Sequence, residues 1–222
     1  MSPGAARVRV KVCGVTRPQD AVAVEAAGAD AVGVIFAAGS RRRVDLARAA
    51  EVVAPLGPFV ARVGVFVDPG LDEVHAAVEH LRLQAVQLHG RVPAAMLAEL
   101  RVRVVVVRAL TWRAGLDLEA LAREPVDALL FDGPRAGSGE PFDWDGAGGL
   151  RRLPSWVLAG GLHAGNVARA IERLRPPAVD VASGVEAAPG IKDPAKLAAF
   201  MAAVRGAERG AGAPPAGDRA DP

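Results

Sequence analysis

The single cysteine of this chain, Cys13, stands where a thiol could do chemistry. Alternating basic and apolar residues run from Arg9 into Cys13, and Gly14 follows. This pattern is typical of a β-strand that carries the thiol at its carboxyl end. A cysteine so placed can act as a base or a nucleophile, because both roles need the thiolate and access for a substrate. Lys11 shares its face, so we expect that charge to lower the pKa of Cys13. The alternative is a cysteine that only packs in the core.

Further polar residues stand at or near the predicted ends of later strands. They are Arg42 after the second strand, Gln87 and His89 after the fourth, Arg108 after the fifth, Asp132 after the sixth, and Asp180 and Ser183 in the eighth. Asp132 follows the apolar run Ala128–Phe131, and burial there would raise the pKa of its carboxyl and suit it to act as an acid. The alternatives are that Asp132 caps a loop or helix, or that Asp180 is the acid.

The chain alternates short β-rich runs with helical ones, as βα repeats do. Strands are predicted at Val8–Cys13, Ala31–Phe36, Phe59–Val67, Ala85–Leu88, Arg103–Arg108, Ala128–Asp132, Trp156–Ala159 and Ala178–Ser183. Helices are predicted at Gln19–Ala27, Leu46–Val53, Leu71–Leu81, Pro93–Leu100, Leu116–Arg123, Ala164–Leu174 and Pro194–Val204. The glycine-rich segment 133–150 fits a helix only in part.

Several predicted strands are apolar on both faces, which indicates a parallel sheet covered by helices. The eight βα units favour an α/β fold, a single (β/α)8 TIM barrel with eight parallel strands. An open sheet with fewer strands is the alternative. We predict a catalytic barrel domain over residues 7–205 and a disordered tail over residues 206–222, which are rich in Gly, Ala and Pro. The loops at the carboxyl ends of barrel strands would then bring the polar residues together.

Two glycine-containing turns are placed for phosphate binding. Gly160 and Gly161 follow the seventh predicted strand, and Ser183 and Gly184 close the eighth. Glycine exposes backbone N–H groups, and a helix N-terminus adds partial positive charge. Either turn alone equally fits a plain tight turn. Together, in the two loops where barrels often hold a phosphate, they favour a phosphate site.

Composition argues against several other classes of protein. No run of about 18 apolar residues occurs, and Met1–Ala6 lacks the apolar core of a signal peptide, so no membrane partner is expected. One cysteine allows no intrachain disulfide, which favours a cytoplasmic location. A net charge of +2, the absence of tyrosine and 4% aromatic residues argue against a nucleic-acid partner. The four histidines lack metal-ligand spacing, and we expect no metal, nicotinamide or flavin cofactor.

Colinear segments of the chain resemble the phosphoribosylanthranilate isomerase family. They are KVCGVTRPQDA (11–21), GADAVGVIF (28–36), VGVFV (63–67), QLHG (87–90), GSGEPFDW (137–144), LAGGL (158–162), NVARA (166–170) and VDVASGVEAAPGIKD (179–193). The resemblance extends from about residue 8 to residue 204, and its first and last segments are the most specific. It implies a (β/α)8 barrel and an isomerase of tryptophan biosynthesis.

The resemblance also implies roles in an Amadori rearrangement. The substrate would be N-(5-phosphoribosyl)anthranilate and the product 1-(2-carboxyphenylamino)-1-deoxyribulose 5-phosphate. Cys13 would be the general base and Asp132 the general acid. The substrate-binding residues would be Lys11, Arg42, Gln87, His89 and Asp180, with Arg42 on the anthranilate carboxylate, and the phosphate-binding residues Gly160, Gly161, Ser183 and Gly184.

The chain departs from the family pattern at three loops. Ser40–Arg43 reads Ser-Arg-Arg-Arg where the family usually has Ser-Pro-Arg-Tyr, so an arginine beside Arg42 is an alternative carboxylate ligand. Ala182 replaces one of the usual paired serines, and Ala136–Gly139 replaces a Gly-Gly-Thr-Gly-like loop. The proposed base and acid are both retained.

Two other functions fit the same residues. One is a different phosphosugar lyase or synthase that does not need Cys13. The other is a non-catalytic module that only binds phosphate. A phosphosugar–anthranilate substrate is the expected small-molecule partner, and the chain would be a monomer or a homodimer.

Overall fold

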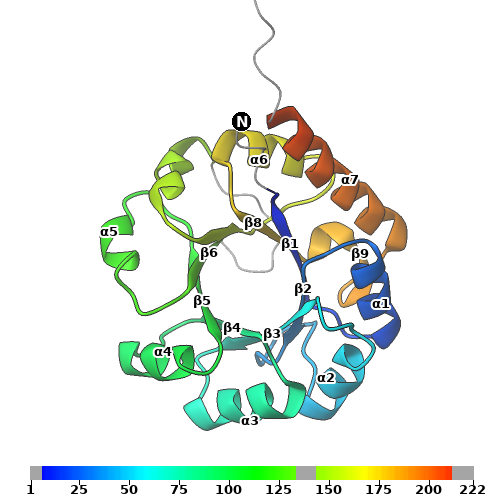
Figure 1. The fold of residues 1–222 in the computed structure, drawn as a ribbon, viewed down its shortest axis with the longest axis vertical. Coiled ribbons are helices and arrows are strands. Elements are labelled where there is room, and N and C mark those ends of the chain that lie inside the picture. Colours follow the sequence, from blue (N-terminus) through cyan, green and yellow to red (C-terminus); the bar gives the residue numbers. More distant parts are fainter. Residues whose placement is uncertain (1–6, 134–143, 212–222) are drawn as a thin grey trace, which may run out of the picture.

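The computed structural model describes residues 7–133 and 144–211, in which eight strands close into a parallel barrel (Figure 1). The strands are β1 (Arg9–Cys13), β2 (Ala31–Ile35), β3 (Ala61–Val67), β4 (Ala85–His89), β5 (Val105–Thr111), β6 (Ala128–Asp132), β7 (Trp156–Leu158) and β8 (Ala178–Val181). Each strand pairs with the next, and β8 pairs with β1. The predicted TIM barrel is confirmed, and the open sheet is excluded.

Helices surround the barrel on its outer side (Figure 1). They are α1 (Pro18–Ala26), α2 (Leu46–Val53), α3 (Leu71–Leu81), α4 (Ala94–Arg101), α5 (Leu118–Leu121), α6 (Val167–Leu174) and α7 (Pro194–Ala211). Between β6 and β7 the described chain forms a 3-10 helix, η1 (Asp145–Arg152), whose glycines disfavour an α-helix. None of the helices within the described ranges is both long and apolar enough to cross a membrane.

The last helix extends further than the sequence predicted. α7 continues to Ala211, so residues 206–211 are helical where we expected a disordered tail. Contacts with the start of β1 account for the difference, since Oε1 of Glu208 accepts hydrogen bonds from the backbone N–H of Val8 and from Arg205. Residues 212–222, the remainder of the expected tail, lie outside the described residues.

The core has an outer and an inner layer, because side chains along a strand alternate between its two faces. Phe131 on β6 is fully buried in the outer layer, between barrel and helices. Leu130 packs inside the barrel with Ala109 and Ala159. Asp132 is two residues beyond Leu130, so the same alternation directs it inward at the rim.

Arg108 lies in the outer layer, which corrects its predicted place at the functional rim. The strand β5 ends at Thr111, three residues beyond the predicted end at Arg108, so Arg108 lies in mid-strand, on the face opposite to Val107 and Ala109, which belong to the inner layer. Its guanidinium donates to the carbonyl oxygens of Val92 and Gly90 rather than reaching the barrel interior.

The loop after β8 contains a feature that the sequence did not predict. A short 3-10 turn, η2 (Ser183–Val185), leads into an antiparallel hairpin of β9 (Glu186–Ala188) and β10 (Ile191–Lys192). Gly190 turns the hairpin with a φ of 81°. Its carbonyl oxygen accepts a hydrogen bond of 2.7 Å from the hydroxyl of Thr16, which joins the hairpin to the loop after β1.

Candidate active site

A cavity of about 850 Å³, its open mouth included, lies at the carboxyl-terminal end of the barrel. Its lining includes nine of the predicted site residues: Cys13, Arg42, Gln87, His89, Asp132, Gly160, Gly161, Asp180 and Ser183. The other two, Lys11 and Gly184, are not in the lining, but each adjoins a residue that is: Lys11 contacts Asp180, and Gly184 follows Ser183. The prediction that these side chains converge on one rim is therefore correct.

Cys13 ends β1 and is paired in register with Gly33 of β2. A Cβ added at Gly33 would lie 3.0 Å from Sγ of Cys13 and 3.1 Å from Cε of Lys11. The glycine therefore leaves the space that both side chains use. The expected sharing of one strand face by Lys11 and Cys13 is what brings them together here.

The charges around Cys13 correct the expectation that its pKa is lowered. Burial raises the pKa of the thiol, the ammonium of Lys11 lowers it, and Asp180 raises it again, so the net pKa lies above the ordinary value. Lys11 is itself engaged, since its Nζ donates to Oδ2 of Asp180 at 2.9 Å. Burial lowers the pKa of Lys11, but Asp180 and Cys13 outweigh it and raise the net value. The neighbouring charge was predicted, and the desolvation was not.

The two aspartates occupy different surroundings. Asp132 ends β6, and its Oδ1 accepts the backbone N–H of Gly133 at 2.8 Å. Gly160 makes this approach possible, because a Cβ there would lie 2.4 Å from that nitrogen and 2.9 Å from Oδ1 of Asp132. Asp180 is buried, and its Oδ1 has no hydrogen-bond partner among the described residues. Each aspartate thus presents a carboxyl group to the cavity.

Gln87 and His89 form a polar pair on β4. Nε2 of Gln87 lies 2.8 Å from Nε2 of His89, so the amide donates and the imidazole carries its own hydrogen on Nδ1. Burial, and to a smaller extent the charge of Lys11, lowers the pKa of His89 to about 4. His89 is therefore a neutral group in the cavity near pH 7. Oδ1 of Asp180 and Oε1 of Gln87 are both buried without a hydrogen-bond partner in the described part of the chain.

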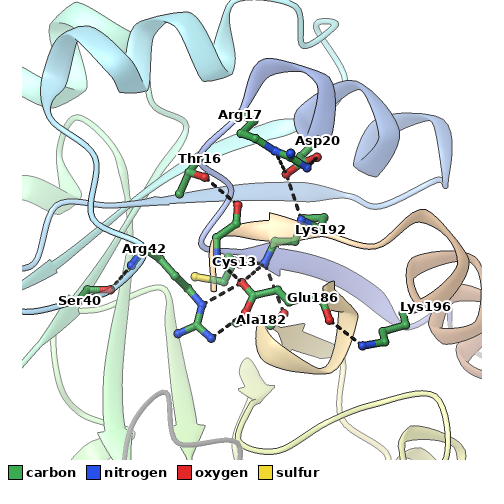
Figure 2. Close-up of polar contacts among 11 residues, drawn as sticks. Cys13, Thr16, Arg17, Asp20, Ser40, Arg42, Ala182, Glu186, Lys192 and Lys196 are labelled. Atoms are coloured by element: carbon green, nitrogen blue, oxygen red, sulfur yellow. Dashed lines mark hydrogen bonds and ion pairs between the residues drawn. The ribbon is translucent and has the colours of Figure 1, made fainter. Parts of the chain in front are cut away.

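Arg42 reaches the cavity from the loop after β2 and is held by Glu186 (Figure 2). Its Nε and Nη2 donate to the two carboxylate oxygens of Glu186 at 2.9 and 2.8 Å. Gly14 is necessary for this path, because its φ is 70° and a Cβ there would lie 2.4 Å from Cδ of Arg42. A guanidinium has five N–H groups, so three are left for a ligand after the two bonds to Glu186.

The two glycine turns meet at one side of the cavity. Gly160 and Gly161 have φ values of 86° and 62°, a region that favours glycine. Gly184 approaches so closely that a Cβ on it would lie 1.9 Å from the carbonyl oxygen of Leu162. Within the described ranges, the backbone N–H groups of Gly161, Ser183 and Gly184 have no backbone acceptor. Such groups suit an anion.

Sequence reasoning missed two charged residues of the site, Glu186 and Lys192. Both are buried in the β9–β10 hairpin, and they form an ion pair of 2.9 Å. Their signal was present as isolated charges in a segment of small residues, but no periodicity assigned them to a strand. The loop Ala136–Gly139 lies outside the described residues. In the described part of the chain, His, Cys, Asp and Glu side chains form no group of three or more suited to a metal ion.

Comparisons with known proteins agree on one family. The family model described as N-(5′-phosphoribosyl)anthranilate (PRA) isomerase matches residues 10–203. The N-(5′-phosphoribosyl)anthranilate isomerase of Deinococcus radiodurans is 46% identical over 92% of this chain and 99% of the relative. That of Halorhodospira halophila is also 46% identical, over 92% and 98%.

Solved structures give the same result. The phosphoribosyl anthranilate isomerase of Thermus thermophilus superimposes with a TM-score of 0.85 at 42% identity, over 90% of this chain and 99% of the other. A further phosphoribosyl anthranilate isomerase, solved in complex with reduced 1-(o-carboxyphenylamino)-1-deoxyribulose 5-phosphate, has a TM-score of 0.81 at 37% identity over the same shares.

Proposed function

This chain belongs to the N-(5′-phosphoribosyl)anthranilate isomerase family, and from that membership we propose how its own residues divide the reaction. The enzyme converts N-(5′-phosphoribosyl)anthranilate to 1-(2-carboxyphenylamino)-1-deoxyribulose 5-phosphate, a step of tryptophan biosynthesis. The alternatives of a lyase, a synthase or a non-catalytic phosphate-binding module are set aside by this membership.

Asp132 is the general acid and Cys13 the general base of the proposal. The furanose ring opens when its oxygen receives a proton from Asp132 and the anthranilate nitrogen forms a double bond to C1′. The Cys13 thiolate then takes the proton from C2′, and the electron pair returns to the nitrogen as an enolamine, which tautomerises to the ketone. One acid and one base suffice for these proton transfers. The observation that carries the proposal is that both side chains line one cavity.

The two charged ends of the substrate are held at separate places. We assign the anthranilate carboxylate to the free N–H groups of Arg42, and the phosphate to the backbone N–H groups of Gly161, Ser183 and Gly184. Anchoring both ends places C1′ and C2′ between acid and base, so that binding energy supplies orientation. The carboxylate assignment favours Arg42 over its neighbours because Arg42 lines the cavity and they do not.

The remaining predicted residues surround the sugar. Gln87 and neutral His89 offer hydrogen bonds to its hydroxyl groups, and Gly160 leaves room for Asp132. Lys11 is proposed to act on the reaction through Asp180 and Cys13 rather than by touching the substrate.

Separate Cys13→Ala and Asp132→Asn variants test the two roles. Loss of a general acid or base typically lowers kcat by about 100- to 10,000-fold. Fluorescence of the anthranilate group follows turnover, and product binding, measured by calorimetry, should persist in both variants. Near-normal turnover in either folded variant contradicts the role assigned to that residue.

Asp180 is the second candidate for the acid, because its unpartnered Oδ1 belongs to a cavity-lining residue. Its Oδ2 is committed to the ammonium of Lys11, an ion pair that suits a carboxylate and not a proton donor. We therefore expect Asp132→Asn to lower kcat by more than Asp180→Asn. The reverse order of the two kcat values would assign the acid to Asp180.

The proposal also covers the organisation of the protein. Residues 7–205 form the catalytic domain, with α7 continuing the folded part to residue 211. We propose that the protein is located in the cytoplasm. Its partner is the small-molecule substrate, and we propose that it binds neither nucleic acid nor membranes. A dimeric phosphoribosylanthranilate isomerase is known from Thermotoga maritima, and this chain is proposed to be a monomer or a homodimer. Light scattering after size-exclusion chromatography distinguishes the two states.

A further inference from the structure

A buried cluster of three charged side chains adjoins the cavity through Arg42, which is part of the cavity lining; Figure 2 shows the contacts within the cluster. Arg42, Glu186 and Lys192 have side chains that are 8%, 5% and 1% exposed. Glu186 and Lys192 come from the β9–β10 hairpin, and Arg42 comes from the loop after β2. The cluster is therefore a connection between loops that are more than 140 residues apart in sequence.

Glu186 holds the guanidinium of Arg42 in one orientation. Two hydrogen bonds join the groups, from Nε to Oε1 and from Nη2 to Oε2. A bidentate pair fixes both the position and the plane of a guanidinium. Oε1 of Glu186 accepts further hydrogen bonds, from the backbone N–H of Gly190 at 3.1 Å and from Nζ of Lys192 at 2.9 Å. The carboxylate is thus itself fixed on the hairpin.

Lys192 extends the cluster to the strand that carries the thiol. Its Nζ donates to the carbonyl oxygen of Cys13 at 2.6 Å and to that of Ala182 at 3.3 Å. The single ammonium therefore joins the ends of β1 and β8 to Glu186. Further along, the backbone N–H of Lys192 donates to Oδ2 of Asp20, which is itself paired with Arg17 (Figure 2).

We propose that Glu186 is a positioning residue for the isomerase reaction, which aims Arg42 at the substrate carboxylate, while Lys192 keeps that aim in register with Cys13. The inference rests on the proposed function, because it takes Arg42 as the carboxylate ligand. The hydrogen bonds to Glu186 use one edge of the guanidinium and leave Nη1 and one hydrogen of Nη2 for the substrate.

Charge and aim make opposite predictions for a Glu186→Gln variant. Arg42, Glu186 and Lys192 together carry one positive charge, and the substitution raises this to two. If charge alone matters, the variant should bind its anionic substrate more tightly and KM should fall. If Glu186 orients Arg42, KM should rise despite the added charge, because the glutamine amide has one acceptor oxygen where the carboxylate has two for Nε and Nη2 of Arg42.

Steady-state kinetics on the full chain tests the proposal, with Arg42→Met as reference. We expect KM to rise about 10- to 100-fold in Arg42→Met and about tenfold in Glu186→Gln, with kcat changing less than KM in both. The double variant Glu186→Gln/Lys192→Met restores the original net charge and should still show a raised KM. Glu208→Gln is the matched control, since Glu208 is partly buried and also paired with an arginine but contacts the other end of β1.

The outcomes separate the inference from the proposed function. An unchanged or lowered KM in folded Glu186→Gln, beside a raised KM in Arg42→Met, overturns the inference alone. An unchanged KM in Arg42→Met overturns both the carboxylate assignment and the inference. Should the variants not fold, a crystal structure of the wild-type protein with reduced product decides. Arg42 must then contact the carboxylate while keeping both bonds to Glu186, and a guanidinium that has left Glu186 overturns the inference.

Discussion

Gly184 is the point at which the two proposed phosphate loops approach each other most closely, so one added methyl group should separate them. A Cβ at this position would lie 1.9 Å from the carbonyl oxygen of Leu162 and 3.0 Å from Cα of His163. The φ of Gly184 lies outside the left-handed region, so Gly184→Ala changes the space and not the permitted backbone conformation. The perturbation is therefore purely steric.

The size of the effect follows from that distance. Real Cβ atoms essentially never come within 3.0 Å of such a neighbour, so one loop must move. The required movement is about 1 Å, and a misplacement of that size can cost about 100-fold in rate. We expect Gly184→Ala to lower kcat/KM by about 10- to 100-fold, mainly through KM, because the phosphate takes no part in bond changes. Overpacking should also cost about 1–3 kcal/mol of stability.

Turnover kinetics, inhibition by inorganic phosphate and a thermal melt together measure this prediction. The inhibition constant for phosphate should rise along with KM. Gly206→Ala is the matched control, because Gly206 lies in α7 with nothing within 4 Å of its added Cβ, and it should keep wild-type kinetics. Wild-type KM and wild-type phosphate inhibition in Gly184→Ala would show that the contact does not shape the phosphate site.

Three further predictions concern the acid, the base and the buried imidazole. Gly160→Ala should lower kcat by a larger factor than it raises KM, because its Cβ would displace Gly133 and the Asp132 carboxyl. Equal factors for kcat and KM would contradict this. Alkylation of Cys13, the single cysteine of the chain, by iodoacetamide should still accelerate with pH at pH 9, because burial above all raises the pKa of the thiol and the thiolate is the reactive form; a rate that levels off below pH 8 would refute it. When the pH is lowered from 7 to 5, His89 should reduce the free energy of unfolding of the wild type by about 2 kcal/mol. A His89→Gln variant should not show this reduction. The imidazole binds a proton near pH 6.5 in the unfolded chain but only near pH 4 in the folded protein, so the free energy of unfolding decreases as the pH is lowered from 7 to 5. Chemical denaturation at pH 7 and at pH 5 measures this difference.

The strands of the barrel were predictable because each is a short apolar run between turn residues. Both ends of β6 agree with the prediction, as do those of α2 and α3. The β9–β10 hairpin was not predictable, because its strands have only three and two residues and show no alternation of apolar and polar residues. The start of β5 was placed two residues early because a row of valines carries no signal for its first paired residue.

The residues that line the site were easier to predict than their hydrogen-bond partners and pKa values. Strand ends in a parallel barrel share one rim, so Cys13, Gln87 and Asp132 meet there by topology alone. The partner of Arg42 was not predictable, since Glu186 is 144 residues away and no local pattern links the two. The pKa of Cys13 was predicted in the wrong direction, because a sequence shows which charges are near but not how much water is excluded.

A raised pKa at Cys13 is compatible with its role as a base. Each unit of increase lowers the thiolate fraction near neutral pH about tenfold, but it also makes the thiolate a stronger base. Taking for proton abstraction the Brønsted coefficient of about 0.5 that thiolates show as nucleophiles, abstraction gains about threefold per unit, so the net loss is about threefold. Lys11 and Lys192 both lower the pKa of the thiol against the effect of burial. These two ammonium groups therefore limit a cost that an apolar barrel interior alone would make larger.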